Sequence, residues 1–112
     1  MLNKRNRLTK QKDFDHVFQK GLSGFDKNLG AKIVKNNFQE NRFGVIVSSK
    51  VSKKAVERNK TKRRIREIIK NHLDKIAPGF DIVIVVLPES QKKSFKELEN
   101  SFLKNLKKLK LL

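Results

Sequence analysis

The chain has 112 residues, with 28 Lys and Arg against 11 Asp and Glu, which gives a formal net charge of +17 at pH 7. This length allows a single domain, residues 1–112, while 37% hydrophobic residues, the absence of cysteine and the lack of a long apolar run exclude full disorder, a disulfide scaffold and a membrane-spanning helix. With no apolar segment long enough for a membrane span or signal region, we expect a cytoplasmic protein. Because the charge is too large to serve solubility alone, we expect its partner to be a polyanion, either a nucleic acid or an anionic membrane surface.

The N-terminal part of the chain is basic and then becomes amphipathic. The first dozen residues carry five cations and no acid, so we expect residues 1–8 to form a basic arm that lies extended along an anionic partner and is mobile without it. Phe14 and Phe18, with a valine between them, then recur at helical spacing. Thr9 is the expected N-cap and Gly21 the expected end, which predicts a short amphipathic helix.

Two β-branched runs follow. Residues 22–29 show no clear period, whereas residues 31–35 and 43–47 are short, apolar and β-branched, which predicts two strands. The residues between these runs are rich in Asn and Gln, which favour turns. The two strands are therefore predicted to form a hairpin with a long loop.

The second half of the chain has the strongest periodic signals. Residues 53–73 contain no Gly or Pro and are rich in Lys, Arg, Glu and Ile, which predicts a long helix. Residues 80–87 form a continuous apolar run, typical of a strand buried on both faces at the centre of a sheet. Ser94 and Glu97 form a capping box ahead of a last amphipathic helix. The order helix, strand, strand, helix, strand, helix predicts an α+β domain with one mixed sheet covered by helices.

The long helix has an apolar side and an unusually basic one. At 100° per residue Ile65, Ile68 and Ile69 share the apolar side, and six cations with no acid lie between Arg58 and Arg66. Like charges one turn apart repel by a few tenths of a kcal/mol per pair, and ordinary solvated helices interleave acids to avoid this. The missing counter-charge therefore predicts that this helix binds a polyanion.

The aromatic pair in the first helix has two interpretations. Phe14 and Phe18 are one turn apart, a spacing that usually belongs to a core. The alternative is a cleft between this helix and the sheet in which unpaired nucleotides stack on a phenyl ring. Both interpretations hold if one ring is covered and the other is half-exposed.

The sequence offers no constellation for autonomous catalysis. It contains no Ser-His arrangement, no suitably paired carboxylates, no phosphate-binding glycine loop and no zinc-ligand spacing. His16 and His72 are isolated, so we interpret them as structural or solvated residues. We therefore expect neither an active site nor a bound metal in the protein alone.

The sequence of residues 53–67, KKAVERNKTKRRIRE, resembles the signature helix of the protein subunit of bacterial ribonuclease P, the ribonucleoprotein endonuclease that removes 5′ leaders from precursor tRNA. Residues 5–21 and 43–50 are similar to other parts of that family. The resemblance implies a fold like that of the second domain of a ribosomal protein from the small subunit. In this fold the β-α-β crossover is left-handed, where the general rule expects a right-handed one.

The resemblance also implies different roles for the RNA subunit and the protein subunit. The RNA subunit carries the chemistry and binds the Mg²⁺ ions that activate the water, with no ion held by the protein alone. One protein per RNA subunit binds both the catalytic RNA and the single-stranded leader of the precursor tRNA, without a membrane partner.

Site residues carry over by position. The family's Arg-Asn-Arg motif maps to Arg58, Asn59 and Lys60, where Lys60 keeps the charge but loses the planar fork that grips phosphate bidentately. The residues that the resemblance assigns to RNA binding are, on the long helix, Lys53, Arg58, Asn59, Lys60, Lys62, Arg63 and Arg66, and at the N-terminus, Arg5 and Arg7. Arg58 and Lys62 lie at the edge of the apolar side, so their stems are expected to lie along the sheet.

The family's leader-binding cleft maps to Phe14 and Phe18. Lys32 takes the place of an aromatic residue often found on the first strand of that cleft, and the chain has no Tyr or Trp. We therefore expect weaker stacking on the leader and stronger electrostatic attraction than in other members.

Three other functions remain open from the residues alone. A non-catalytic RNA-binding module, such as a ribosomal protein, would bind structured RNA without affecting tRNA processing. A DNA-binding protein would prefer duplex DNA, although no helix-turn-helix arrangement is visible. A self-sufficient nuclease would cut RNA with no RNA subunit present.

Overall fold

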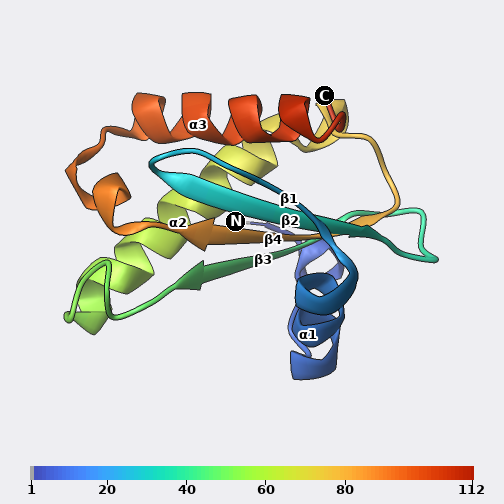
Figure 1. Cartoon of the computed structure of the whole chain (residues 1–112), viewed down its shortest axis with the longest axis horizontal. Coiled ribbons are helices and arrows are strands. Elements are labelled where there is room, and N and C mark those ends of the chain that lie inside the picture. The colour runs from blue at the N-terminus through green and yellow to red at the C-terminus, as the bar shows by residue number, and fades with distance from the viewer. Residues whose placement is uncertain (1) are drawn as a thin grey trace.

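The computed structural model describes residues 2–112, so Met1, which belongs to the predicted domain and arm, lies outside the described residues. A mixed sheet has two helices on one face and one on the other (Figure 1). None of the helices in residues 2–112 is long and apolar enough to cross a bilayer. The helices are α1 (Gln11–Lys20), α2 (Ala55–His72) and α3 (Phe95–Lys108), with short 3₁₀ turns at Lys4–Asn6, Leu73–Lys75 and Pro88–Lys92; the strands are β1 (Leu22–Phe25), β2 (Leu29–Lys35), β3 (Arg42–Val47) and β4 (Phe80–Val86).

The strand β4 lies inside the sheet, as its continuous apolar run predicts. The strand order is β1-β2-β4-β3, with β2 antiparallel to β1 and β4, and β3 parallel to β4. The predicted hairpin of β2 with β3 is therefore wrong, because β4 lies between them. The polar loop between β2 and β3 crosses the end of β4 instead, where the Asn41 side chain donates to the Ala77 carbonyl and accepts from the Phe80 amide.

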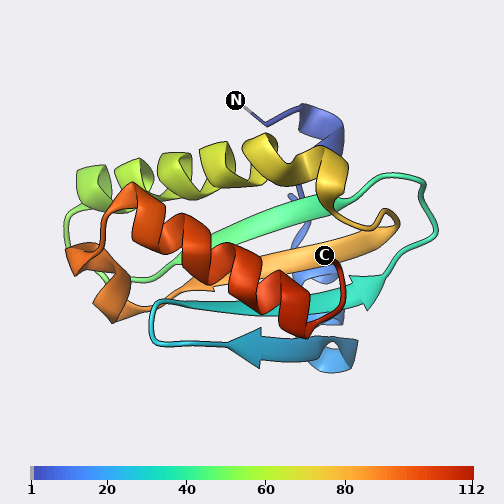
Figure 2. The same cartoon turned by 90° about the horizontal axis from the view of Figure 1, so that it is seen from above.

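A left-handed crossover joins the two parallel strands. The chain leaves β3, returns through α2 on one face of the sheet and enters β4 beside β3 (Figure 2). Parallel strands joined in this way are right-handed in nearly all folds. This exception, which the family resemblance implied, places the basic helix α2 over the β3 side of the sheet.

The two faces of the sheet are covered unequally. Alternate residues of β2, namely Leu29, Ala31 and Ile33, are buried under α2 and α3 in the main core. On the opposite face Val17 of α1 packs against Val83 of β4. Because α1 stands under one end of the sheet (Figure 1), it covers this second face only in part.

The N-terminal segment is packed against the domain. Leu2 is 2% exposed in the core, and the Leu8 amide donates to the Phe43 carbonyl over 2.8 Å. Arg7 forms an isolated parallel bridge with Phe43 on β3. The prediction of an extended arm is wrong for residues 2–8, because two apolar side chains and this bridge hold the segment beside β3.

The helix ends agree with the sequence patterns except at one position. Lys10, not Thr9, is the N-cap of α1, and it makes no side-chain capping bond. Gly21 ends α1 as predicted, its amide donating to the Val17 carbonyl. The capping box of α3 is confirmed, because the Ser94 hydroxyl accepts from the Glu97 amide and the Glu97 carboxylate accepts from the Ser94 amide.

Candidate nucleic-acid interface

The start of α2 is fixed by side chains that reach back to the preceding loop. The Arg58 guanidinium donates to the Ser52 carbonyl over 2.8 Å, and the Ser52 hydroxyl donates to the Glu57 carboxylate over 2.5 Å. Arg58 is half-buried, as its place at the edge of the apolar side predicted. It therefore holds the helix start in addition to presenting a charge.

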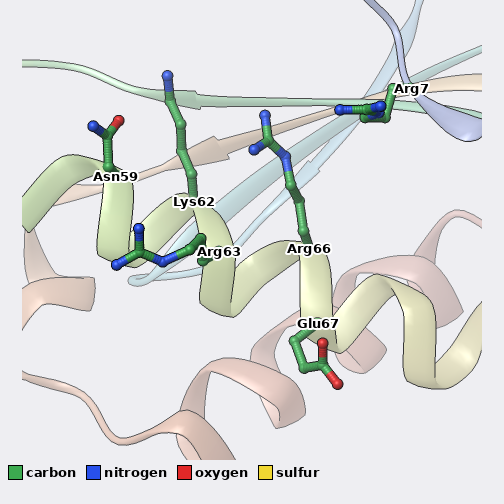
Figure 3. A pocket seen from close by; sticks show the side chains of 6 residues that line it. All are labelled: Arg7, Asn59, Lys62, Arg63, Arg66 and Glu67. Atoms are coloured by element: carbon green, nitrogen blue, oxygen red, sulfur yellow. The ribbon is translucent and has the colours of Figure 1, made fainter. Parts of the chain in front are cut away.

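A basic groove runs between α2 and the N-terminal segment. Figure 3 shows Asn59, Lys62 and Arg66 projecting from α2 on the side that faces Arg7. The hollow measures about 470 Å³ and brings together four cations and one acid. The residues that line this basic groove are Arg7, Asn59, Lys62, Arg63, Arg66 and Glu67.

Arg7 forms the second wall of the basic groove because of its backbone pairing. The bridge to Phe43 fixes its main chain at the edge of β3, and its Nε is buried with no hydrogen-bond acceptor among residues 2–112. An unsatisfied guanidinium donor is costly, and phosphate oxygens are strong acceptors for it. The basic groove thus has the charge and the donors that an RNA phosphate requires.

The remaining predicted cations lie elsewhere. Lys60 and Arg64 face a different hollow, on the flank of α2 next to the turn before α3. Lys53 is exposed ahead of the helix, and Arg5 is exposed beside Glu40, with 3.7 Å between Arg5 Nε and Glu40 Oε1. The structure therefore divides the predicted basic set into the basic groove and a scattered remainder that includes Lys60 of the three-residue motif.

The aromatic pair is divided between packing and exposure. Phe14 packs against Gly44 of β3, whereas Phe18 is 39% exposed. The Lys32 Nζ lies 5.3 Å from the centroid of the Phe18 ring and 3.5 Å from the Phe18 carbonyl oxygen. One covered ring and one half-exposed ring are the combination under which both interpretations of the pair hold. Phe18 and Lys32 together present an aromatic edge and a cation.

Two exposed aromatic residues were missed by the sequence reasoning. Phe25 ends the edge strand β1, and Phe38 lies in the loop before β3 with its ring centroid 4.7 Å from the Arg42 guanidinium carbon. Each is flanked directly by polar or small residues, Phe25 by Gly24 and Asp26 and Phe38 by Asn37 and Gln39. An isolated Phe in such surroundings is the signal that could have marked them.

One histidine links the two helices that cover the main core. His72 Nε2 lies 3.0 Å from a Glu99 oxygen, which joins α2 to α3 and lowers the pKa of Glu99. Within residues 2–112 no group of three or more His, Asp or Glu side chains is placed to hold a metal ion. The cations and donors of the basic groove have the chemistry to bind a nucleic acid.

Comparison with known proteins agrees with this geometry. The family model described as Ribonuclease P matches residues 2–110. The chain is 41% identical over 106 residues to the ribonuclease P protein component of Clostridium botulinum, covering 94% of this chain and 95% of that protein. It is also 41% identical over 106 residues to the ribonuclease P protein component of Synechocystis, covering 90% and 86%.

Solved structures give the same result. The RNase P protein of Staphylococcus aureus superimposes with a TM-score of 0.87 at 31% identity, covering 95% of this chain and 96% of that one. The RNase P protein of Thermotoga maritima superimposes with a TM-score of 0.81 at 30% identity, covering 88% and 92%.

Proposed function

The chain belongs to the ribonuclease P protein family, and we propose that it binds the catalytic RNA of that enzyme through α2 and the 5′ leader of precursor tRNA through the α1 face of the sheet. As a ribonuclease P protein component it is a subunit of ribonuclease P and serves in the maturation of the 5′ end of tRNA. The observation that carries the proposal is the pairing of a basic groove with a separate aromatic and cationic surface on one small domain.

The RNA subunit carries out the hydrolysis in this proposal. Mg²⁺ ions bound by the RNA supply the activated water and stabilise the departing charge. No step that this proposal assigns to the protein passes through a metal. The protein contributes binding energy and position.

The basic groove is the proposed contact with ribonuclease P RNA. Lys62 and Arg66 project from a rigid helix toward Arg7, so a phosphate entering the groove meets donors from two sides. Neutralised phosphates release counterions, which makes this binding strongly dependent on salt. The same RNA-binding helix carries Arg58, Asn59, Lys60 and Arg63, and Lys53 lies just ahead of it.

The surface at Phe18 and Lys32 is the proposed contact with the leader. A base can stack on the exposed part of the Phe18 ring while the Lys32 ammonium approaches a phosphate, and Phe14 holds the helix in place. Mature tRNA lacks the leader and gains nothing from this surface. The enzyme therefore prefers the precursor to the product.

The test is leader cleavage of a precursor tRNA by a bacterial ribonuclease P RNA at low Mg²⁺, with and without the protein, together with a protein-only reaction. We expect stimulation only when RNA and protein are both present. Cleavage by the protein alone would show a nuclease, and no effect of the correctly folded protein would favour a general RNA-binding module.

A matched pair of variants assigns the effect to the basic groove. Lys62→Ala removes a cation that lines the groove, whereas Lys70→Ala removes an exposed cation of the same helix outside it. We expect Lys62→Ala to weaken assembly with the RNA and Lys70→Ala to leave it nearly unchanged. Equal effects would contradict the placement of the RNA in the groove.

The assembly has one protein per RNA subunit and no membrane partner in this proposal, and it works in the bacterial cytoplasm. Titrating the RNA with protein and measuring the mass of the complex checks the stoichiometry.

A further inference from the structure

The sheet face that carries α1 extends beyond the helix toward the outer strand β1. On this face β2 presents Gly30 and Lys32, alternate residues that are only half-buried, while the residues between them are buried under α2 and α3. Val85 of β4, paired with Gly30, is half-buried on the same face. These residues form an uncovered strip of this face beyond α1, which stands under one end of the sheet (Figure 1).

Phe25 stands at the outer end of this strip. Its backbone is paired with Gly30, so its side chain lies on the α1 face, two positions along β1 from the residue paired with Lys32. The side chain is 71% exposed. Burial of a phenyl group normally stabilises a fold, and Phe25 makes little use of this gain.

Gly30 leaves room beside the Phe25 side chain. A Cβ at position 30 would lie 3.8 Å from the Phe25 Cβ and 3.9 Å from the Val85 Cβ, so there is space for a side chain that the sequence omits. Gly30, Val85 and the exposed Phe25 side chain thus form one stretch of this face on which a planar group has room to lie.

The surroundings of Phe25 are cationic. Lys108 reaches the edge of β1 from α3 on the other face of the sheet, where its Nζ lies 3.5 Å from the Phe25 carbonyl oxygen, and the exposed Lys27 follows in the next turn. The neighbouring carboxylate, that of Asp26, is turned toward α3, where it accepts hydrogen bonds from the Ser101 hydroxyl and from two amides of its own turn. An exposed aromatic side chain with ammonium groups nearby matches a nucleotide, which combines a planar base with an anionic phosphate.

We propose that Phe25 is a stacking platform for one unpaired nucleotide of the precursor leader, farther from the cleavage site than the nucleotide at Phe18. The inference rests on the proposed function, in which the leader crosses the α1 face. This order of the two nucleotides follows from the strand order of the sheet. The proposed site of the catalytic RNA is at α2, which lies over the outer strand β3, whereas Phe25 lies on β1, the outer strand at the opposite edge. A second copy of this chain is disfavoured as the occupant because its net charge of +17 would repel the first.

The experiment uses the reconstituted holoenzyme and precursor tRNAs whose leaders are shortened one nucleotide at a time from the 5′ end. Precursor affinity is measured for wild type, Phe18→Ala, Phe25→Ala, Phe25→Trp and Leu22→Ala. Leu22 is the matched control because it is 70% exposed on the same strand but lies on the opposite face of the sheet. Circular dichroism confirms that each variant is folded.

With a long leader we expect Phe25→Ala to weaken precursor binding about fivefold or more, the scale of one lost stacking contact. Phe25→Trp retains binding because it keeps an aromatic face, and Leu22→Ala has no effect. As the leader shortens, the Phe25→Ala deficit disappears at a greater length than the deficit of Phe18→Ala.

Other outcomes overturn the inference and leave the proposed function separable from it. If Phe18→Ala weakens leader binding and Phe25→Ala does not, Phe25 is no platform but the leader site stands. A Phe25→Ala deficit equal for all leader lengths and for mature tRNA rules out a leader base as the occupant. If wild type sediments as a dimer and Phe25→Ala as a monomer, with no loss of leader binding, the surface at Phe25 is an interface between copies of the chain. If wild type shows no preference for a leader, the proposed leader site fails first.

Discussion

The Phe14 ring occupies the space where a side chain at position 44 would stand. A Cβ built on Gly44 would overlap two carbon atoms of that ring, and Gly44 is buried in the middle of β3. The helix α1 therefore docks on the sheet through a contact between an aromatic ring and bare backbone. The position of Phe18 over Lys32, four residues farther along α1, depends on this contact.

Replacing Gly44 by Ala should destabilise the protein and displace α1. Overpacking a filled site costs about 1–3 kcal/mol, so we expect the free energy of unfolding to fall by that amount. Gly30→Ala is the matched control because its Cβ would meet ordinary contacts of 3.8 Å or more. Urea unfolding of both variants measures the difference, and an equal loss at both positions would contradict the role of the Phe14 contact.

Arg42 and Asp81 form a largely buried ion pair. The Asp81 side chain is 5% exposed and accepts two bonds from the Arg42 guanidinium, of 2.9 and 2.6 Å, and a third from Asn36. The bond to Asp81 raises the pKa of Arg42. The pair joins the starts of β3 and β4 at the end of the sheet where the loop after β2 crosses.

Breaking this pair from one side should cost more than removing it whole. Arg42→Met leaves the Asp81 carboxylate buried without its cation, and we expect a loss of roughly 3–5 kcal/mol in unfolding free energy. Asp81→Asn added to Arg42→Met removes the stranded charge and should recover part of that loss. A double variant as unstable as the sum of the two single variants would show that the side chains do not interact.

The periodic signals predicted the three helices and the strands β2, β3 and β4, because each buries one face or both against the core. β1 was not predicted because its apolar residues, Leu22 and Phe25, point to opposite faces and are both exposed, so no period marks it. The false hairpin arose because neighbours in sequence were expected to pair. In the structure β4 pairs with β2 along one edge and with β3 along the other, so β2 and β3 do not meet. Such pairing between strands far apart in the chain is not marked by any local sequence pattern.

The candidate site was predictable on one wall only. The run of cations on α2 is a local feature, and the structure confirms that Lys62, Arg63 and Arg66 share a surface. The position of Arg7 opposite them follows from the burial of Leu2 and the bridge to Phe43, which are long-range contacts. The separation of Lys60 from Lys62 is local, because side chains two residues apart on a helix point about 200° apart.

The bond between Ser101 and Asp26 should make stability depend on pH. Burial raises the pKa of the Asp26 carboxyl, but the hydrogen bonds from Ser101, Leu29 and Asn28 outweigh it and hold the pKa below its ordinary value of 3.8. A carboxyl whose pKa is lowered by folding stabilises the protein above its unfolded pKa, and this stabilisation is lost as the pH falls through the folded pKa. Stability is thus expected to fall on acidification below 3.8.

Ser101→Ala tests this linkage. At neutral pH we expect a loss of roughly 1 kcal/mol, the low end for a hydrogen bond to a charged group, because solvent reaches this carboxylate. The difference from wild type should shrink as the pH falls through the folded pKa of Asp26, below which both proteins protonate this carboxyl. Unfolding of wild type, Ser101→Ala and the exposed-site control Ser23→Ala is compared at neutral pH and over a series of acidic pH values. A difference that stays constant with pH would mean that Ser101 acts through packing alone.

The two walls of the basic groove should contribute independently to the salt dependence of RNA binding. Each lost phosphate contact reduces the steepness of log affinity against log salt by roughly 0.7–0.9. We therefore expect Arg7→Ala and Lys62→Ala each to reduce it by about that amount, and the double variant by about twice as much. Lys70→Ala, an exposed cation of α2 outside the groove, should leave the slope unchanged. Binding of ribonuclease P RNA measured over a range of monovalent salt gives the slopes. Because Arg7 lies on a different segment from α2, an unchanged slope in Arg7→Ala alone would confine the RNA to the helix and remove the N-terminal wall from the interface.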